Sequence, residues 1–253
     1  MRTRIPRLKA FYRIANVHLS RITYILGLGV VIAGVTGCAN SVTQPDAPLC
    51  GVTRGALSQL KHDPILFVHG YGGSTENFCT MIDGFRADGW TDNELYAYNY
   101  SFVTSYATDA EEIRGQVDAI LARTGAVHVD IIGHSAGSVS SRYYIKNLGG
   151  ASKVDAWVSL AGPNHGTDAA ENCSFAPCLE IRPGSAFLAA LNAGDETPGL
   201  VRYGTWWSSC DDTINPDSSV LLAGATNHQS SCLAHFNFLI DPVVYQQVRD
   251  WIQ

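Results

Sequence analysis

Short apolar runs alternate along the chain with longer segments whose apolar residues recur at helical spacing. The short runs predict strands over residues 64–68, 95–100, 127–132, 154–160, 201–207 and 220–224. The helical spacing predicts helices over residues 77–88, 109–123, 136–147, 186–192 and 242–252. Strands that alternate with helices build a mostly parallel sheet with helices on both faces, so the pattern predicts one α/β domain.

The first 37 residues have a different character. Six basic residues and no acidic residue precede an apolar run over residues 22–35, which is the layout of an export signal. This run is shorter than the roughly 20 residues that a membrane-spanning helix needs. It ends in Val35-Thr36-Gly37-Cys38, which resembles the bacterial lipobox, where the cysteine is lipidated. We therefore predict a lipoprotein-type signal peptide over 1–37, a lipid on Cys38 and a polar tether over 38–61, with simple secretion or an uncleaved anchor as alternatives.

Export changes how charge and cysteines are counted. Without the six basic residues of the signal, 11 of the 17 Lys and Arg remain against 23 Asp and Glu, a formal net charge near −12. Such a surface repels phosphate backbones and argues against nucleic-acid binding. Besides Cys38 there are six cysteines, which in an oxidising compartment predict three disulfides. Proximity along the chain favours the pairs Cys50–Cys79, Cys173–Cys178 and Cys210–Cys232. No Cys-x-x-Cys pair is present, so we predict no metal site.

A candidate nucleophile lies between a predicted strand and a predicted helix, in Gly133-His134-Ser135-Ala136-Gly137. A serine in a Gly-x-Ser-x-Gly turn is held above the edge of a sheet, and the glycines leave room for backbones that pack closely. The following helix points its positive end at the site, which favours an anionic intermediate. We predict that Ser135 is a nucleophile; a glycine-rich turn without chemistry is the alternative.

Acyl transfer also needs amide donors for the oxyanion. In this arrangement one is the amide after the nucleophile, here Ala136, and one comes from the loop after an earlier strand. His69-Gly70-Tyr71-Gly72-Gly73 follows the first predicted strand, which nominates the Tyr71 amide. A plain glycine turn beside a core His69 is the alternative.

The general base must be a histidine after the nucleophile, because the chain order is serine, acid, histidine. Only His165, His228 and His235 follow Ser135. His165 comes before any plausible acid, so we predict that it lines the pocket, and His228 is predicted to be a solvated loop residue. His235 precedes the last helix and is the predicted base.

The acid should follow a strand and precede His235. Two adjacent carboxylates, Asp211 and Asp212, follow the strand predicted at 201–207. Adjacent side chains point in different directions, so only one can reach the imidazole. We predict Asp211, with Asp212 and then Asp195 as alternatives, and the residue not used is expected to be solvated.

Several motifs together resemble the small secreted bacterial lipases of the class 2 type, a branch of the α/β-hydrolases. They are residues 64–73 (PILFVHGYGG), 129–137 (VDIIGHSAG), 144–148 (YIKNL), 211–216 (DDTINP), and His235 followed by 241–242 (DP). The resemblance covers about residues 62–253. It implies an α/β-hydrolase catalytic domain with a small or absent lid.

The resemblance also implies a reaction. It is the hydrolysis of carboxylic esters, triacylglycerol or shorter acyl esters, by Ser135, His235 and Asp211 without a cofactor. The expected partner is a small-molecule or lipid ester, with membrane contact through the lipid anchor and no oligomer. A catalytically silent binding lipoprotein, a polyester depolymerase or transacylase, and a peptidase are the alternatives.

Residues 167–197 depart from the smallest members of the family as an insertion, which we predict to form a disulfide-stiffened rim of the pocket. Trp206 and Trp207 either bind an acyl chain or pack in the core.

Overall fold

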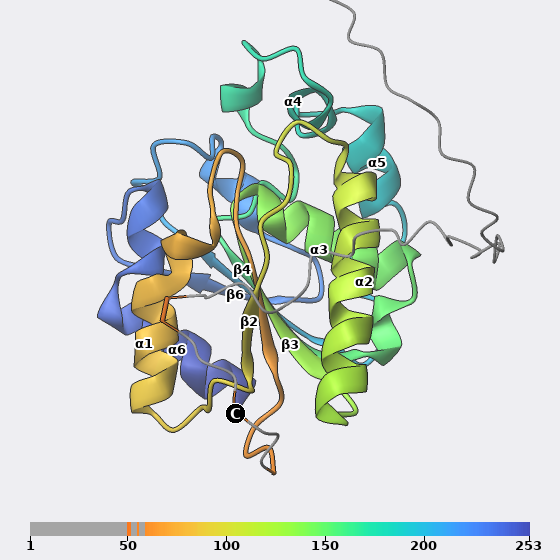
Figure 1. The fold of residues 1–253 in the computed structure, drawn as a ribbon. Coiled ribbons are helices and arrows are strands. Elements are labelled where there is room, and N and C mark those ends of the chain that lie inside the picture. Colours follow the sequence, from red (N-terminus) through yellow and green to blue (C-terminus); the bar gives the residue numbers. More distant parts are fainter. Residues whose placement is uncertain (1–49, 52–54, 56–58) are drawn as a thin grey trace, which may run out of the picture. The chain divides into compact units, whose positions relative to one another are not determined.

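The computed structural model describes residues 50–51, 55 and 59–253 (Figure 1). The predicted signal peptide, the lipidation site Cys38 and most of the predicted tether lie outside the described residues. Within the described part, no helix combines the length and the apolar character needed to cross a membrane.

A six-stranded parallel sheet has the order β2-β1-β3-β4-β5-β6. Its strands are β1 (Ile65–Val68), β2 (Leu95–Ala97), β3 (Val129–His134), β4 (Val154–Leu160), β5 (Arg202–Trp207) and β6 (Thr226–Gln229). The chain runs outward from β1 to β2, returns past β1 to β3, and then proceeds to β6. The direction therefore reverses between β1 and β3, and the carboxyl ends of strands at such a reversal are where α/β sheets bind ligands.

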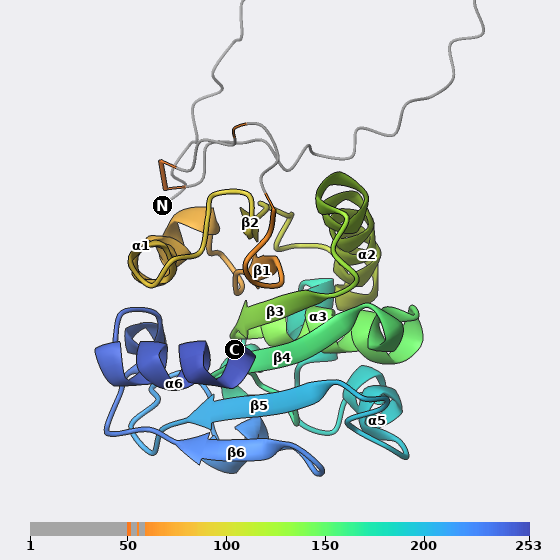
Figure 2. The same ribbon diagram turned by 90° about the horizontal axis from the view of Figure 1, so that it is seen from below.

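Helices cover both faces of this sheet (Figure 2). They are α1 (Cys79–Ala87), α2 (Tyr106–Thr124), α3 (Ala136–Asn147), α4 (Ala176–Glu180), α5 (Ala186–Asn192) and α6 (Pro242–Ile252). The pleat of β1 explains the two layers, because successive side chains point to opposite faces. Ile65 and Phe67 pack with residues of α1 and α6, whereas Leu66 and Val68 pack with residues of α2 and α3. The predicted parallel sheet with helices on both faces is confirmed.

The last strand was predicted in the wrong place. Residues 220–224 form the end of a 3-10 turn, η4 (Asp217–Val220), and a loop, and the strand lies at β6. Val220 and Leu222 are buried, so the apolar run at 220–224 reflects burial in the core rather than a strand. The edge strand β6 has the sequence TNHQ and is mostly exposed, so it shows no apolar run.

The aromatic residues near β5 belong to the core. Trp206 is fully buried, and the ring of His228 in β6 stacks on it with ring centroids 4.3 Å apart. Trp207 is partly buried and packs against the same cluster. The prediction of a solvated His228 is therefore wrong, since a neighbouring strand supplies an indole surface that covers its ring.

All three predicted disulfides are present. The S–S distances are 2.13 Å for Cys50–Cys79, 2.02 Å for Cys173–Cys178 and 2.06 Å for Cys210–Cys232. The first pair fastens Cys50, within the predicted tether, to the start of α1.

The insertion over 167–197 is attached to the rest of the domain by polar contacts. The Glu180 carboxylate accepts hydrogen bonds from the Ser105 hydroxyl (2.6 Å) and the Tyr106 amide (2.8 Å), at the N-terminus of α2. Arg182 donates to three carbonyl oxygens of the insertion, those of residues 170, 171 and 173. The insertion contains α4 and α5, and the contacts of Glu180 join it to the N-terminus of α2 (Figure 1).

Candidate active site

Strand β3 ends in a sharp turn at Ser135. This residue has φ 53° and ψ −128°, a conformation that non-glycine residues adopt only where surrounding structure enforces it. A Cβ on Gly133 would lie 2.8 Å from the backbone of Ser138, and one on Gly137 would overlap the carbonyl oxygen of Val68. Both glycines of the motif are thus needed for the strand, turn and helix to pack closely, as predicted.

The loop after β1 passes directly against Ser135. A Cβ on Gly70 would lie 2.7 Å from the Ser135 Cβ. Tyr100 donates a hydrogen bond from its hydroxyl to the His69 carbonyl, and its ring stacks on His69 at 4.2 Å. His69 is buried, and its Nδ1 lies 2.9 Å from the Gly70 carbonyl oxygen of the same loop.

The two predicted oxyanion donors belong to segments that flank Ser135. The Tyr71 amide follows Gly70 in the loop after β1. The Ala136 amide is at the first position of α3, where a helix N–H has no partner within the helix. Both residues are therefore on backbone that can present an N–H group to an oxyanion beside Ser135.

The predicted acid and base are in contact. His235 begins the 3-10 helix η5 (His235–Leu239) and is buried. Its Nδ1 lies 3.1 and 3.0 Å from the two carboxylate oxygens of Asp211. Since a carboxylate only accepts hydrogen bonds, Nδ1 carries the proton and Nε2 of the neutral ring keeps its lone pair.

Asp211 is kept ionised by its surroundings. Burial by itself would raise the pKa of this carboxyl, but the hydrogen bond and charge of His235 and two backbone amides bring the pKa below its ordinary value. The two amides are those of Thr213 (2.8 Å) and Ile214 (2.9 Å), which also fix the direction of the carboxylate.

Ser135 and His235 line the same cavity, whose volume is about 230 Å³. Tyr71 and Phe236, with exposed fractions of 41% and 58%, also line it and are the apolar groups at its opening. The remaining lining residues are Gly70, Gly73, Asn77, His134 and Thr213. Within the described residues, the lining comes from the loops after β1, β3 and β5 and from η5 rather than from the insertion.

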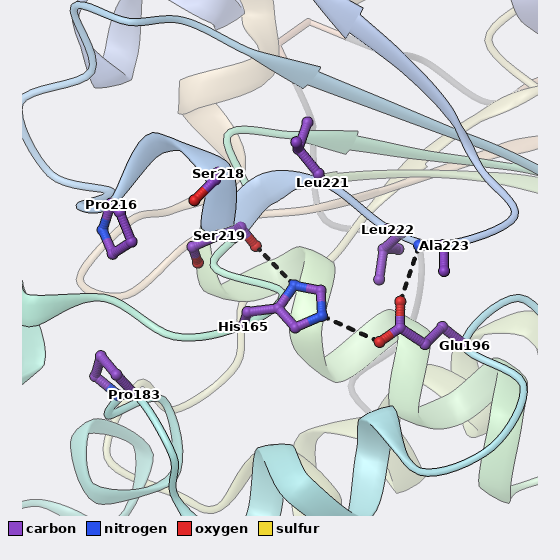
Figure 3. A pocket seen from close by; sticks show the side chains of 9 residues that line it. All are labelled: His165, Pro183, Glu196, Pro216, Ser218, Ser219, Leu221, Leu222 and Ala223. Atoms are coloured by element: carbon purple, nitrogen blue, oxygen red, sulfur yellow. Dashed lines mark hydrogen bonds and ion pairs between the residues drawn. The ribbon is translucent and has the colours of Figure 1, made fainter.

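His165 lines a different hollow, of about 550 Å³, so the prediction that it lines the pocket of Ser135 is wrong. Figure 3 shows its ring between the Glu196 carboxylate, 3.0 Å from Nε2, and the Ser219 carbonyl oxygen, 3.3 Å from Nδ1. The loop after β4 turns away from Ser135 and carries His165 toward η4. Asp195, the third candidate acid, is exposed and accepts the Thr197 amide instead.

Sequence reasoning missed two residues that touch His235. Asp212 is exposed, as expected, and its carboxylate also accepts the backbone N–H of His235 at 3.1 Å. His134 is buried, and its Nε2 lies 3.1 Å from the His235 carbonyl oxygen. Both residues adjoin predicted site residues in the sequence, but only the fold places them against His235.

Within the described segments, no group of three or more His, Cys, Asp or Glu side chains is arranged to bind a metal ion.

A parallel sheet with a strained serine at the reversal of strand order, and a bonded aspartate and histidine later in the chain, defines an α/β-hydrolase. The model of the lipase (class 2) family matches residues 62–232, and the chain belongs to this family. The match includes Ser135 and Asp211 and ends three residues before His235.

The sequences of two triacylglycerol lipases match part of this chain. Triacylglycerol lipases of Pseudarthrobacter phenanthrenivorans and Burkholderia plantarii are each 33% identical to it over 90 residues, 32% of this chain. The matched region spans 27% and 24% of those two proteins, about a quarter of their length.

Solved structures with the same fold include a Bacillus licheniformis lipase in its mature form and Aspergillus fumigatus lipase B. The bacterial lipase has a TM-score of 0.68 at 14% identity, over 78% of this chain and 96% of its own. The fungal lipase has a TM-score of 0.64 at 14% identity, over 80% of this chain and 56% of its own. At this identity the similarity shows a common fold.

Proposed function

We propose that this protein hydrolyses carboxylic esters, with Ser135 as nucleophile, His235 as general base and Asp211 as the acid that orients it. The observation that carries the proposal is the Asp211–His235 hydrogen bond at 3.0 Å, with His235 and Ser135 lining one cavity. Membership of the lipase (class 2) family and the names of the two bacterial relatives support the same reaction.

The reaction proceeds through an acyl-enzyme. His235 Nε2 takes the proton of the Ser135 hydroxyl while its oxygen attacks the ester carbonyl carbon. The amides of Tyr71 and Ala136 donate to the oxyanion, and His235 then protonates the departing alcohol. Water repeats the sequence on the acyl-enzyme, which releases the carboxylic acid and restores Ser135.

Each polar group has a defined contribution. Asp211 stabilises the imidazolium that forms when His235 takes the proton, and it holds the ring in the tautomer that leaves Nε2 free. The donors to the oxyanion are backbone amides, so the Tyr71 side chain contributes to substrate fit rather than to the chemistry.

The direct test uses a fluorophosphonate probe and a short-chain nitrophenyl ester. We expect the wild type to be labelled at Ser135 and to hydrolyse the ester, and Ser135→Ala to lose both while melting at the same temperature. Ser218→Ala, at an exposed serine of the other hollow, is the matched control and should retain both. Ester hydrolysis by Ser135→Ala at the wild-type rate would contradict the proposal.

The substrate class follows from the chemistry of the opening. Apolar groups at the mouth favour esters with an apolar acyl group, triacylglycerol or shorter acyl esters, presented as single molecules or from a lipid phase. A series of nitrophenyl esters, a triglyceride emulsion and an amide would separate esterase, lipase and amidase activity. Turnover of the amide alone would contradict the assignment.

We also propose that the protein is an exported monomer, held at the cell envelope through a lipid on Cys38. Three disulfides are typical of proteins that fold in an oxidising compartment. The test is incorporation of radiolabelled palmitate by the full chain and by Cys38→Ser. Equal labelling of the two would contradict lipidation at Cys38.

A further inference from the structure

Besides Asp211, two side chains make polar contacts with His235, and both bond to its main chain. The His235 N–H donates to Asp212 at 3.1 Å, and the His235 carbonyl accepts from His134 Nε2 at 3.1 Å. We propose that His134 and Asp212 are positioning residues, which hold the main chain of His235 so that its ring stays aligned with Ser135. This inference rests on the proposed function, because it assigns a role relative to the general base.

The two contacts come from opposite sides of His235. Asp212 is next to Asp211, so one short loop after β5 binds both the ring and the N–H group of His235. The same loop is joined to the chain before His235 by the Cys210–Cys232 disulfide and by the Ser208 hydroxyl, which accepts the Leu233 amide at 2.9 Å. Acid and base are thereby held as one unit.

His134 joins that unit to the nucleophile. It is the last residue of β3 and directly precedes Ser135, whose own amide is fixed by the Leu160 carbonyl at 2.9 Å. The hydrogen bond from His134 to His235 therefore spans from the turn that carries the nucleophile to the turn that carries the base. A side chain at this position can therefore set the separation of the two turns.

The protonation state of His134 suits this role. A carbonyl oxygen only accepts, so Nε2 must carry the proton. Burial, and the positive charge that His235 can carry, lower the pKa of His134 to about 3, so its ring is neutral at physiological pH. The ring centroids of His134 and His235 are 4.7 Å apart. A neutral His134 therefore adds no like-charge repulsion when His235 becomes an imidazolium.

The experiment compares removal of each hydrogen bond with its conservative replacement. His134→Leu removes the donor at similar volume, whereas His134→Gln keeps an amide N–H at the reach of Nε2. Asp212→Ala removes the acceptor, whereas Asp212→Asn keeps a carbonyl oxygen. His228→Leu, which removes a half-buried histidine ring that stacks on Trp206, is the matched control.

We expect kcat for a short-chain nitrophenyl ester to fall about 10- to 100-fold in His134→Leu and Asp212→Ala, because small displacements of a catalytic group cost rates of this order. KM should change less than about three-fold, and the Gln and Asn variants should recover most of kcat. Each rate is divided by the number of sites that fluorophosphonate labels at saturation, which removes any unfolded fraction. His228→Leu should retain the wild-type kcat.

The outcomes are distinguishable. A wild type that does not react with fluorophosphonate overturns the proposed function. A reactive wild type, together with His134→Leu and Asp212→Ala variants that keep their kcat per labelled site, overturns only the positioning roles. The positioning roles are also overturned if His134→Gln is as slow as His134→Leu and Asp212→Asn is as slow as Asp212→Ala. Asp212 is exposed, so its variants keep the inference testable if His134→Leu does not fold.

Discussion

Asp109→Asn should stabilise this protein at alkaline pH and change its stability much less under mildly acidic conditions. Asp109 is in the first turn of α2 and is 1% exposed. Burial, followed by the charges of Glu112 and Glu180, raises its pKa from 3.8 to about 7, although a hydrogen bond from Thr104 lowers it. The protein thus contains a carboxyl group that is costly to ionise in the folded state.

The sign follows from proton binding. Between pH 4 and 7 the folded state holds a proton that the unfolded state has released, so stability falls as pH rises through this window and is level above it. About three pKa units at about 1.4 kcal/mol each set an upper limit near 4 kcal/mol. The helix dipole stabilises the ionised form of a carboxylate in the first turn by about 0.3–1 kcal/mol, which reduces this cost. We therefore expect Asp109→Asn to gain up to about 3 kcal/mol at pH 8.

Urea unfolding of wild type and variant at pH 4.5 and pH 8 measures this difference. Asp118→Asn is the control on the same helix, because Asp118 is half exposed and pairs with Lys153 at 2.6 Å. Its free energy of unfolding should change by less than about 1 kcal/mol at either pH. The reasoning is refuted if Asp109→Asn changes stability equally at pH 4.5 and pH 8, or destabilises the protein at pH 8.

Three further predictions concern the stability of the folded state. Gly137→Ala should lower the stability measured by thermal melting by at least about 1–3 kcal/mol, because its Cβ would overlap the Val68 carbonyl oxygen. Gly115→Ala, in α2 with open space around it, is the control and should raise the stability by about 0.5–1 kcal/mol. Replacing both Cys210 and Cys232 by serine should cost about 3 kcal/mol for a loop of 22 residues, and reductant should no longer affect melting through this pair. The pKa of His134 lies near 3 in the folded state and near 6.5 in the unfolded state, so between these pH values only the unfolded state binds the proton. The stability of the wild type should therefore fall by about 1.4 kcal/mol per pH unit as the pH is lowered from 6.5 toward 3. His134→Gln should lack this part of the slope; an unchanged slope would contradict a buried, neutral ring.

Much of the site was predictable because its chemistry is coded locally. The strand, turn and helix around Ser135 follow from an apolar run, two glycines and helical spacing, all within about 20 residues. The order of serine, acid and histidine then reduced eight histidines to His228 and His235, and the place of His235 before the last helix selected it. The three disulfides were predictable because each joins cysteines close in the sequence. Local propensity and chain order suffice for features of this kind.

Other features depend on contacts between distant segments. The edge strand β6 is polar, so only its pairing with β5 identifies it. The locations of His165 and His228 depend on where the loop after β4 turns and on which indole covers a ring. The contacts of His134 and Asp212 with His235 join residues 101 and 23 positions apart. The sequence by itself determined the fold class and predicted Ser135, Asp211 and His235 as the residues of the candidate site. Only the tertiary structure decided which side chains surround His235, because such contacts depend on how the loops at the ends of the strands meet rather than on local propensity.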